Sequence, residues 1–131
     1  MNTWDALHQQ ERFRPKYPLD HIVRQVLTQF PRDREKRKEM KILDLGCGAG
    51  RHVVFLAQEG FQAYGTDLSK EGLKHTQERL ESEGLYGTIQ QAVINNQPYP
   101  NNYFDGILCV GVIYYNAVSY THLTLPTNRE V

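Results

Sequence analysis

The chain has 131 residues, of which 23% are charged, and its formal net charge at pH 7 is zero. This length suits one domain with one core, and the balanced charge provides no broad field that would favour nucleic acid or an anionic membrane as a partner. No run approaches the length of a membrane span and no signal-peptide core is present, so we expect a cytoplasmic protein. Two cysteines without a C-x-x-C motif indicate neither a disulfide framework nor a metal site.

Two helical segments are predicted before the first strand. Residues 3–13 form one of them, and Asp20 opens a clearer one whose apolar residues repeat at helical spacing. Basic residues within 32–38 alternate with acidic ones, so we interpret this stretch as a solvated linker rather than a nucleic-acid patch. Residues 1–40 are therefore expected to form a helical cap and linker.

The most informative stretch is a short apolar strand, predicted at 41–46, that carries Asp44 and runs into three glycines at alternate positions. These glycines are Gly46, Gly48 and Gly50. An apolar helix is predicted directly afterwards, at 51–59. Because glycine lacks Cβ and tolerates positive φ, such a turn brings bare backbone and a helix N-terminus up to a ligand. A dinucleotide fingerprint would place its third glycine at position 51, which is Arg51.

A second strand, predicted at 61–66, is also followed by an acidic residue. Asp67 lies 23 residues after Asp44, close to the distance of about 20 residues at which a second-strand carboxylate binds a ribose diol. Charged acceptors make the stronger hydrogen bonds to such hydroxyl groups. The alternative role for Asp67 is a helix cap, but Ser69 is the better N-cap for the helix predicted at 70–83.

The remaining elements continue the alternation of strands and helices. A weaker strand is predicted at 87–93 and a fourth strand at 104–110. This order predicts an α/β, Rossmann-like, doubly wound and mostly parallel sheet. Ligands bind outside the carboxyl ends of such strands, where the glycine turn, Asp67 and Val110 are expected to converge.

The motif D-x-G-x-G-x-G that begins at Asp44 resembles the cofactor loop of the class I S-adenosylmethionine-dependent methyltransferases. The stretch Q-P-Y-P-N-N-Y-F-D at 97–105 resembles the segment that leads into the fourth strand in many small-molecule methyltransferases. Together the resembling residues extend over roughly 40–115. The resemblance implies the N-terminal half of that fold, S-adenosyl-L-methionine as the cofactor, and methyl transfer to a small-molecule acceptor.

The resemblance also implies which residues hold the cofactor. Asp44 would offset its positive charges, directly or through water, and loop N–H groups would meet its carboxylate. Asp67 would bind the ribose, and Leu68 would lie against the adenine. The family's third strand often ends in an acidic residue that accepts from the adenine amino group, whereas backbone near Val93 and Ile94, or an Asn side chain, would serve here. The expected cofactor-binding residues are Asp44, Gly46, Cys47, Gly48, Ala49, Gly50, Asp67, Leu68, Val93, Ile94 and Val110.

The acceptor side of the site carries little signal. Residues 110–115 lack the Asn/Asp-Pro-Pro-aromatic loop of enzymes that methylate adenine or glutamine amides, which argues against those acceptors. Methyl transfer is a direct displacement in which positioning can do most of the work, so no catalytic residue is named. His52 and His75 fall in helices and are expected to be partly exposed structural residues. Cys47 and Cys109 are expected as free thiols, with Cys109 buried.

Residues 118–131 do not fit this fold and resemble a translated sequencing-adapter tail, so the partial cofactor domain is predicted at 41–117. A sheet cut after its fourth strand would expose an edge and lack an acceptor pocket, so we expect this truncated chain to be inactive alone. Its oligomeric state stays open. A nicotinamide-dependent oxidoreductase, disfavoured by Arg51, and a non-catalytic binding module or fragment are the alternatives.

Overall fold

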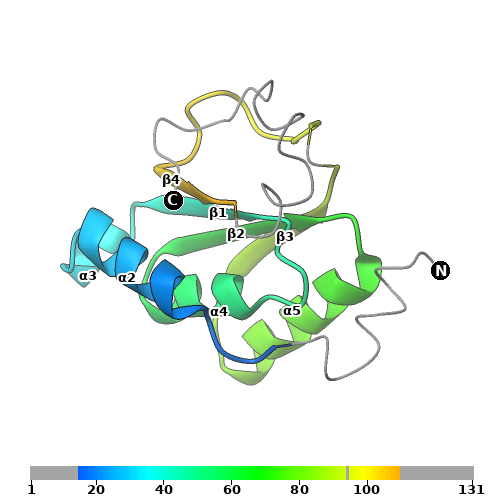
Figure 1. Ribbon diagram of the computed structural model, residues 1–131, viewed down its shortest axis with the longest axis horizontal. Helices are drawn as coiled ribbons and strands as arrows, with labels where there is room; N and C mark the ends of the chain where they lie inside the picture. The colour runs from blue at the N-terminus through cyan, green and yellow to red at the C-terminus, as the bar shows by residue number, and fades with distance from the viewer. Residues whose placement is uncertain (1–14, 94, 110–131) are drawn as a thin grey trace.

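Figure 1 shows a computed structural model of the chain, which describes residues 15–93 and 95–109. Within these residues, parallel strands form one sheet in the order β3-β2-β1-β4. The strands are β1 (Lys41–Leu45), β2 (Gln62–Asp67), β3 (Gly87–Gln91) and β4 (Gly106–Leu108). The helices are α2 (Asp20–Gln29), α3 (Arg34–Arg37), α4 (Arg51–Gln58) and α5 (Lys70–Ser82). The predicted parallel α/β architecture is confirmed.

The strand order reverses direction at β1. Leu43 of β1 pairs with Tyr64 of β2 on one side and with Ile107 of β4 on the other. On the far side of β2, Asp67 pairs with Gln91 of β3. Because the strands are parallel, their carboxyl ends meet at one edge of the sheet, and the turn after β1 lies at the topological switch point. That position is where open α/β sheets bind ligands.

Alternate residues of β1 face opposite sides of the sheet, and each side is apolar. Ile42 belongs to a core shared with the helices, and α4 and α5 lie on the same side of the sheet (Figure 1). Other buried members of this core are Ile22, Val26, Phe30, Val53, Leu56 and Leu80. Leu43 belongs to a second cluster, in which Phe104 and Ile107 pack with Tyr64, Tyr99 and Tyr103. The near-continuous apolar strand therefore follows from burial on both faces.

The charged stretch at 32–38 is exposed, as expected of a solvated linker, except at Arg37. It contains α3, and Arg37 is only 3% exposed. The Arg37 guanidinium donates to the carbonyl oxygens of Pro31 at 2.6 Å and Glu59 at 3.0 Å, and it lies over the Phe61 ring. Its Nη1 also pairs with the Glu59 carboxylate at 3.2 Å. Charge alternation misses this role because the partners of Arg37 come from tertiary structure.

Asp105 lies at the amino end of β4, far from the ligand-binding edge. Its carboxylate accepts a hydrogen bond from the Lys41 N–H at 2.8 Å, and its own N–H donates to the Lys41 carbonyl at 2.7 Å. These bonds set β4 beside the start of β1. The predicted helix at 3–13 and the last predicted residue of the fourth strand, Val110, lie outside the described residues.

Both cysteines are free and Cys109 is buried, as predicted, and Cys47 is buried as well. Cys47 follows β1 and Cys109 follows β4, which are neighbouring strands. In the described parts of the chain, no helix is long and apolar enough to cross a membrane.

Candidate functional site

The turn after β1 depends on its three glycines. Gly46, Gly48 and Gly50 have φ values of 78°, 57° and 95°, a region that side chains other than glycine adopt only with strain. The N–H groups of Gly46 and Cys47 both donate to the Thr66 carbonyl, at 2.8 and 2.9 Å. The turn is therefore fixed to the end of β2 before it enters α4.

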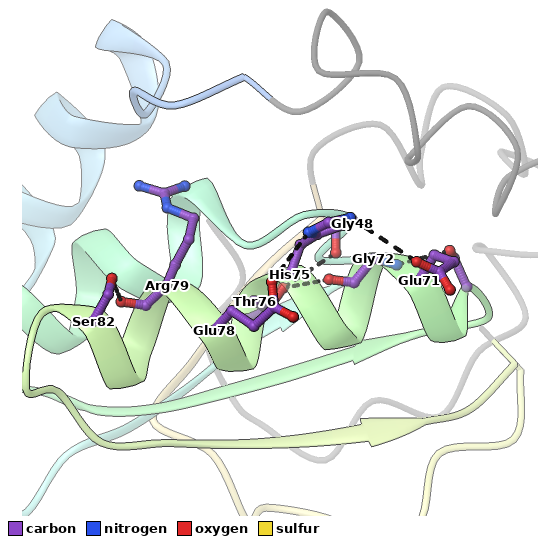
Figure 2. A network of polar contacts seen from close by, with 9 residues as sticks. Gly48, Glu71, Gly72, His75, Thr76, Glu78, Arg79 and Ser82 are labelled. Carbon is purple, nitrogen blue, oxygen red and sulfur yellow. Dashed lines mark hydrogen bonds and ion pairs between the residues drawn. The ribbon is translucent and has the colours of Figure 1, made fainter.

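A second anchor holds the turn against α5, as Figure 2 shows. The Thr76 hydroxyl donates to the Gly72 carbonyl at 2.9 Å and also lies 3.3 Å from the Gly48 carbonyl oxygen. Thr76 is fully buried, and a Cβ built on Gly50 would lie 2.5 Å from its Oγ1. Both the backbone angle and the available space therefore require glycine at position 50. No sequence motif marks Thr76, so sequence reasoning missed it.

The Asp67 carboxylate connects the turn to the start of α5. One oxygen accepts from the Gly48 N–H at 2.8 Å, and the other accepts from the Ser69 N–H at 2.8 Å. Ser69 is the N-cap, as predicted, because its hydroxyl accepts from the Gly72 N–H at 3.0 Å. Each carboxylate oxygen has a second lone pair, so these bonds leave acceptor capacity for a ligand hydroxyl.

Asp44 lies on the strand beside Asp67 and is only 2% exposed. Burial is the main cause that raises the pKa of Asp44, and the charge of Asp67 adds to it, so that the pKa reaches about 7, although Arg51 acts in the opposite direction. Burial, followed by the charges of Asp44 and Asp67, also raises the pKa of the Cys47 thiol. Two neighbouring carboxylates at one edge favour a cationic ligand, because an opposite charge would stabilise the ionised form of Asp44.

An apolar rim lies beside the carboxylates. Leu68 follows β2 and is 47% exposed, and Val93 follows β3 and is 41% exposed. The segment after β3 returns to β2, since the Ala92 N–H donates to the Asp67 carbonyl at 3.1 Å. Most of the predicted site thus converges on one edge, including the buried Ala49, while Ile94 and Val110 lie outside the described residues.

The described residues hold no group of three or more His, Cys, Asp or Glu side chains that could bind a metal ion.

His52 differs from its prediction as a partly exposed residue, since it is only 4% exposed. Its Nε2 accepts a hydrogen bond from the Leu19 N–H at 3.1 Å, at the start of α2. An accepting Nε2 requires a neutral ring. Burial, and after it the charges of Arg51 and His21, lower the pKa of His52 to about 4.

This histidine predicts a loss of stability in acid. The ordinary pKa of histidine is 6.5, whereas that of His52 in the folded chain is about 4. The unfolded chain therefore binds the extra proton first, and stability falls as the pH drops from 6.5 to 4. The His52→Gln variant keeps a hydrogen-bond acceptor that does not titrate. Its stability relative to the parent should therefore rise by up to about 3 kcal/mol as the pH falls from 6.5 to 4. Urea unfolding of both proteins from pH 4 to 8 measures the difference, with His75→Gln as the control. An unchanged difference across the window would refute this role for His52.

Comparison with known proteins assigns the family. The sequence model of the methyltransferase domain matches residues 42–125. The chain belongs to this family. Two solved structures that are 27% and 25% identical to this chain are S-adenosylmethionine-dependent methyltransferases, which identifies S-adenosyl-L-methionine as the cofactor of the family.

Two curated methyltransferases illustrate the relationship. A ubiquinone biosynthesis O-methyltransferase from Dinoroseobacter shibae is 27% identical over 129 residues, which cover 92% of this chain and 51% of the relative. A ribosomal RNA small subunit methyltransferase C from Alcanivorax borkumensis is 42% identical over 52 residues, covering 40% of this chain and 16% of the relative. The chain thus spans about half the length of the first relative, and the second match is confined to a shorter segment.

Solved structures agree on the fold. A Methanococcus maripaludis protein proposed to be an S-adenosyl-L-methionine-dependent methyltransferase superposes with a TM-score of 0.73 at 20% identity, covering 97% of this chain and 61% of that one. A methyltransferase of the same cofactor class from Aquifex aeolicus has a TM-score of 0.53 at 27% identity, covering 65% and 45%.

The residues at this edge fit the methyltransferase cofactor. The ligand carries a cationic sulfonium, an ammonium, a carboxylate, a ribose diol and an adenine. The edge offers two carboxylates, a glycine turn in which Gly46 is exposed and Gly48 is half-buried, and two exposed apolar side chains at Leu68 and Val93. The donor set and the open backbone therefore match the chemistry of the group.

Proposed function

We propose that this edge of the sheet binds S-adenosyl-L-methionine and that the protein transfers its methyl group to a small-molecule acceptor. The observation that carries the proposal is the pair of carboxylates, Asp44 and Asp67, on neighbouring strand ends around a turn of positive-φ glycines. A cationic ligand with a diol suits this pair, because one carboxylate meets the charge and the other accepts from hydroxyl groups.

The roles divide by chemistry. Asp44 faces the cationic groups, and backbone from Gly46 to Gly50, including Cys47, Gly48 and Ala49, surrounds the amino-acid end of the ligand. Asp67 binds the ribose, and Leu68 and Val93 enclose the adenine. Ile94 and Val110 remain sequence predictions of the same site.

The cofactor supplies a methyl group already activated on a sulfonium. The protein's own residues bind and orient it, which is enough for a direct displacement once the acceptor is aligned. The acceptor is proposed to be a small molecule, as the name of the ubiquinone relative suggests. The match to a ribosomal RNA methyltransferase shows that this proposal does not follow from the balanced charge of the chain alone. We also propose that these residues alone bind cofactor without turning over an acceptor.

The nicotinamide alternative receives no support from the chain. Arg51 is the first residue of α4, so a side chain stands where the dinucleotide fingerprint places its third glycine. That glycine serves close helix–strand packing beside the pyrophosphate.

Two aspartates provide a matched test of the ribose role. Asp67→Ala is expected to weaken binding of S-adenosylhomocysteine by about 10- to 100-fold, through loss of charge-assisted hydrogen bonds. Asp105→Ala also removes a carboxylate that accepts from a backbone N–H, but at the opposite edge. It should reduce stability without changing affinity.

An analogue that lacks both ribose hydroxyls separates ligand contact from loosening of the turn. The parent chain should bind it more weakly than S-adenosylhomocysteine, whereas Asp67→Ala should bind the two ligands about equally. Calorimetric titration measures these affinities. If Asp67→Ala discriminates between the ligands as strongly as the parent does, Asp67 does not bind the ribose.

A further inference from the structure

The segment that follows β3 makes a tight turn over the carboxyl end of β2. Val93 forms an isolated antiparallel bridge with Asn96, whose N–H donates to the Val93 carbonyl at 3.2 Å. The Ala92 N–H donates to the Asp67 carbonyl at 3.1 Å. Residues 92–104 contain no charged side chain. Any selectivity of this segment for a ligand base must therefore come from backbone groups or neutral side chains held at fixed positions.

Gln97 connects this turn to the strand that carries Asp67. Its Oε1 accepts from the Thr66 hydroxyl at 2.9 Å, and its Nε2 donates to the Val93 carbonyl at 2.6 Å. Thr66 is 1% exposed, and its carbonyl accepts from the N–H groups of Gly46 and Cys47. One amide side chain thus joins the turn after β3 to the residue on which the glycine turn is fixed.

A second glutamine acts in the same way on the neighbouring residue of the rim. Gln91 donates from Nε2 to the Leu68 carbonyl at 3.0 Å. The backbones of Leu68 and Val93, the two exposed apolar residues at this edge, are therefore each held by a glutamine side chain. Gln97 is the one that also contacts a buried partner on β2.

We propose that Gln97 is a positioning residue that sets base selectivity at the cofactor site. It acts through the Val93 carbonyl and the Thr66 hydroxyl, which together fix the distance between the base-binding turn and the ribose-binding Asp67. This inference rests on the proposed function. Backbone groups that bind a base can distinguish one base from another only while they are held at fixed positions. Unlike a long charged side chain, they cannot reorient toward a base that has shifted.

The test compares the affinities of S-adenosylhomocysteine and S-inosylhomocysteine, which differ in the base alone. The parent chain should prefer the adenosyl ligand. Gln97→Leu should weaken adenosyl binding by about tenfold and reduce the preference toward unity, because the hydrogen bonds to Thr66 and Val93 are lost. Thr66→Val should shift the ratio in the same direction, and the double variant should add little, since both changes break one connection.

Gln77→Leu is the matched control. Gln77 also donates from Nε2 to a neighbouring acceptor, Glu81 at 3.0 Å, but it lies on the exposed face of α5. It should keep the affinity and the base preference of the parent. Should Gln97→Leu fail to fold, Thr66→Val carries the test with the same expected loss of preference.

The outcomes separate the two proposals. Parent protein that binds neither ligand overturns the proposed function and this inference with it. Parent protein that prefers the adenosyl ligand, together with Gln97→Leu and Thr66→Val variants that keep that preference, overturns the role of Gln97 alone. A loss of preference confined to the Gln97 and Thr66 variants supports it.

Discussion

The Asp44→Asn variant is expected to be more stable than the parent chain above pH 7 and to bind S-adenosylmethionine at least about tenfold more weakly. Burial raises the pKa of Asp44 from 3.8 to about 7. The folded chain therefore holds a proton between these values that the unfolded chain releases, so the contribution of Asp44 to stability is present below pH 3.8 and is lost as the pH rises to 7. Asparagine resembles the neutral acid and avoids this loss, which is on the order of 3–4 kcal/mol.

Denaturant unfolding and calorimetry on the same proteins test both effects. The stability difference between Asp44→Asn and the parent should grow from pH 4 to pH 8. Asp20→Asn, which makes the same change at an exposed site in the first turn of α2, is the control. The expected combination of gained stability and lost affinity is typical of groups retained for binding rather than for folding. A variant that gains stability but keeps full affinity would remove Asp44 from the proposed site.

The Gly50→Ala variant is expected to lose about 2–5 kcal/mol of stability. Two costs combine at this position. Its φ of 95° strains any residue with a Cβ, and that Cβ would lie 2.5 Å from Oγ1 of the buried Thr76. Because Thr76 also lies against the Gly48 carbonyl, the clash should displace the whole turn and reduce affinity for S-adenosylhomocysteine as well.

Gly84→Ala separates the two costs. Gly84 also has a positive φ, of 65°, but a Cβ there would meet nothing within 4 Å. It should lose only about 1–2 kcal/mol and leave affinity unchanged. Chemical denaturation of both variants measures the difference, and equal losses would show that the contact between Gly50 and Thr76 is not a tight one.

The parts of the site that were predictable are those with local causes. Alternate glycines predict a turn of positive φ because only glycine adopts that backbone without strain, and all three glycines do so. The cap at Ser69 is likewise a local interaction, between its hydroxyl and the Gly72 N–H. The convergence of Asp44 and Asp67 on one edge follows from parallel strands, which the alternation of elements already indicates.

The residues that were missed have partners distant in the chain. In the sequence Arg37 resembles a solvated residue, but in the fold its guanidinium donates to the carbonyl oxygens of Pro31 and Glu59. His52 accepts a hydrogen bond from the N–H of Leu19, which precedes it by 33 residues. Gln97 lies in a recognisable turn, but its hydroxyl partner Thr66 comes from another strand. Such contacts depend on packing, so no periodicity or spacing in the sequence predicts them.

The most direct test of the central claim is a calorimetric titration of the chain with S-adenosylhomocysteine and, separately, with NAD. The edge formed by Asp44, the glycine turn and Asp67 predicts saturable binding of S-adenosylhomocysteine, which Asp67→Ala weakens, and no binding of NAD at the same concentrations. Saturable binding of NAD without binding of S-adenosylhomocysteine would contradict it.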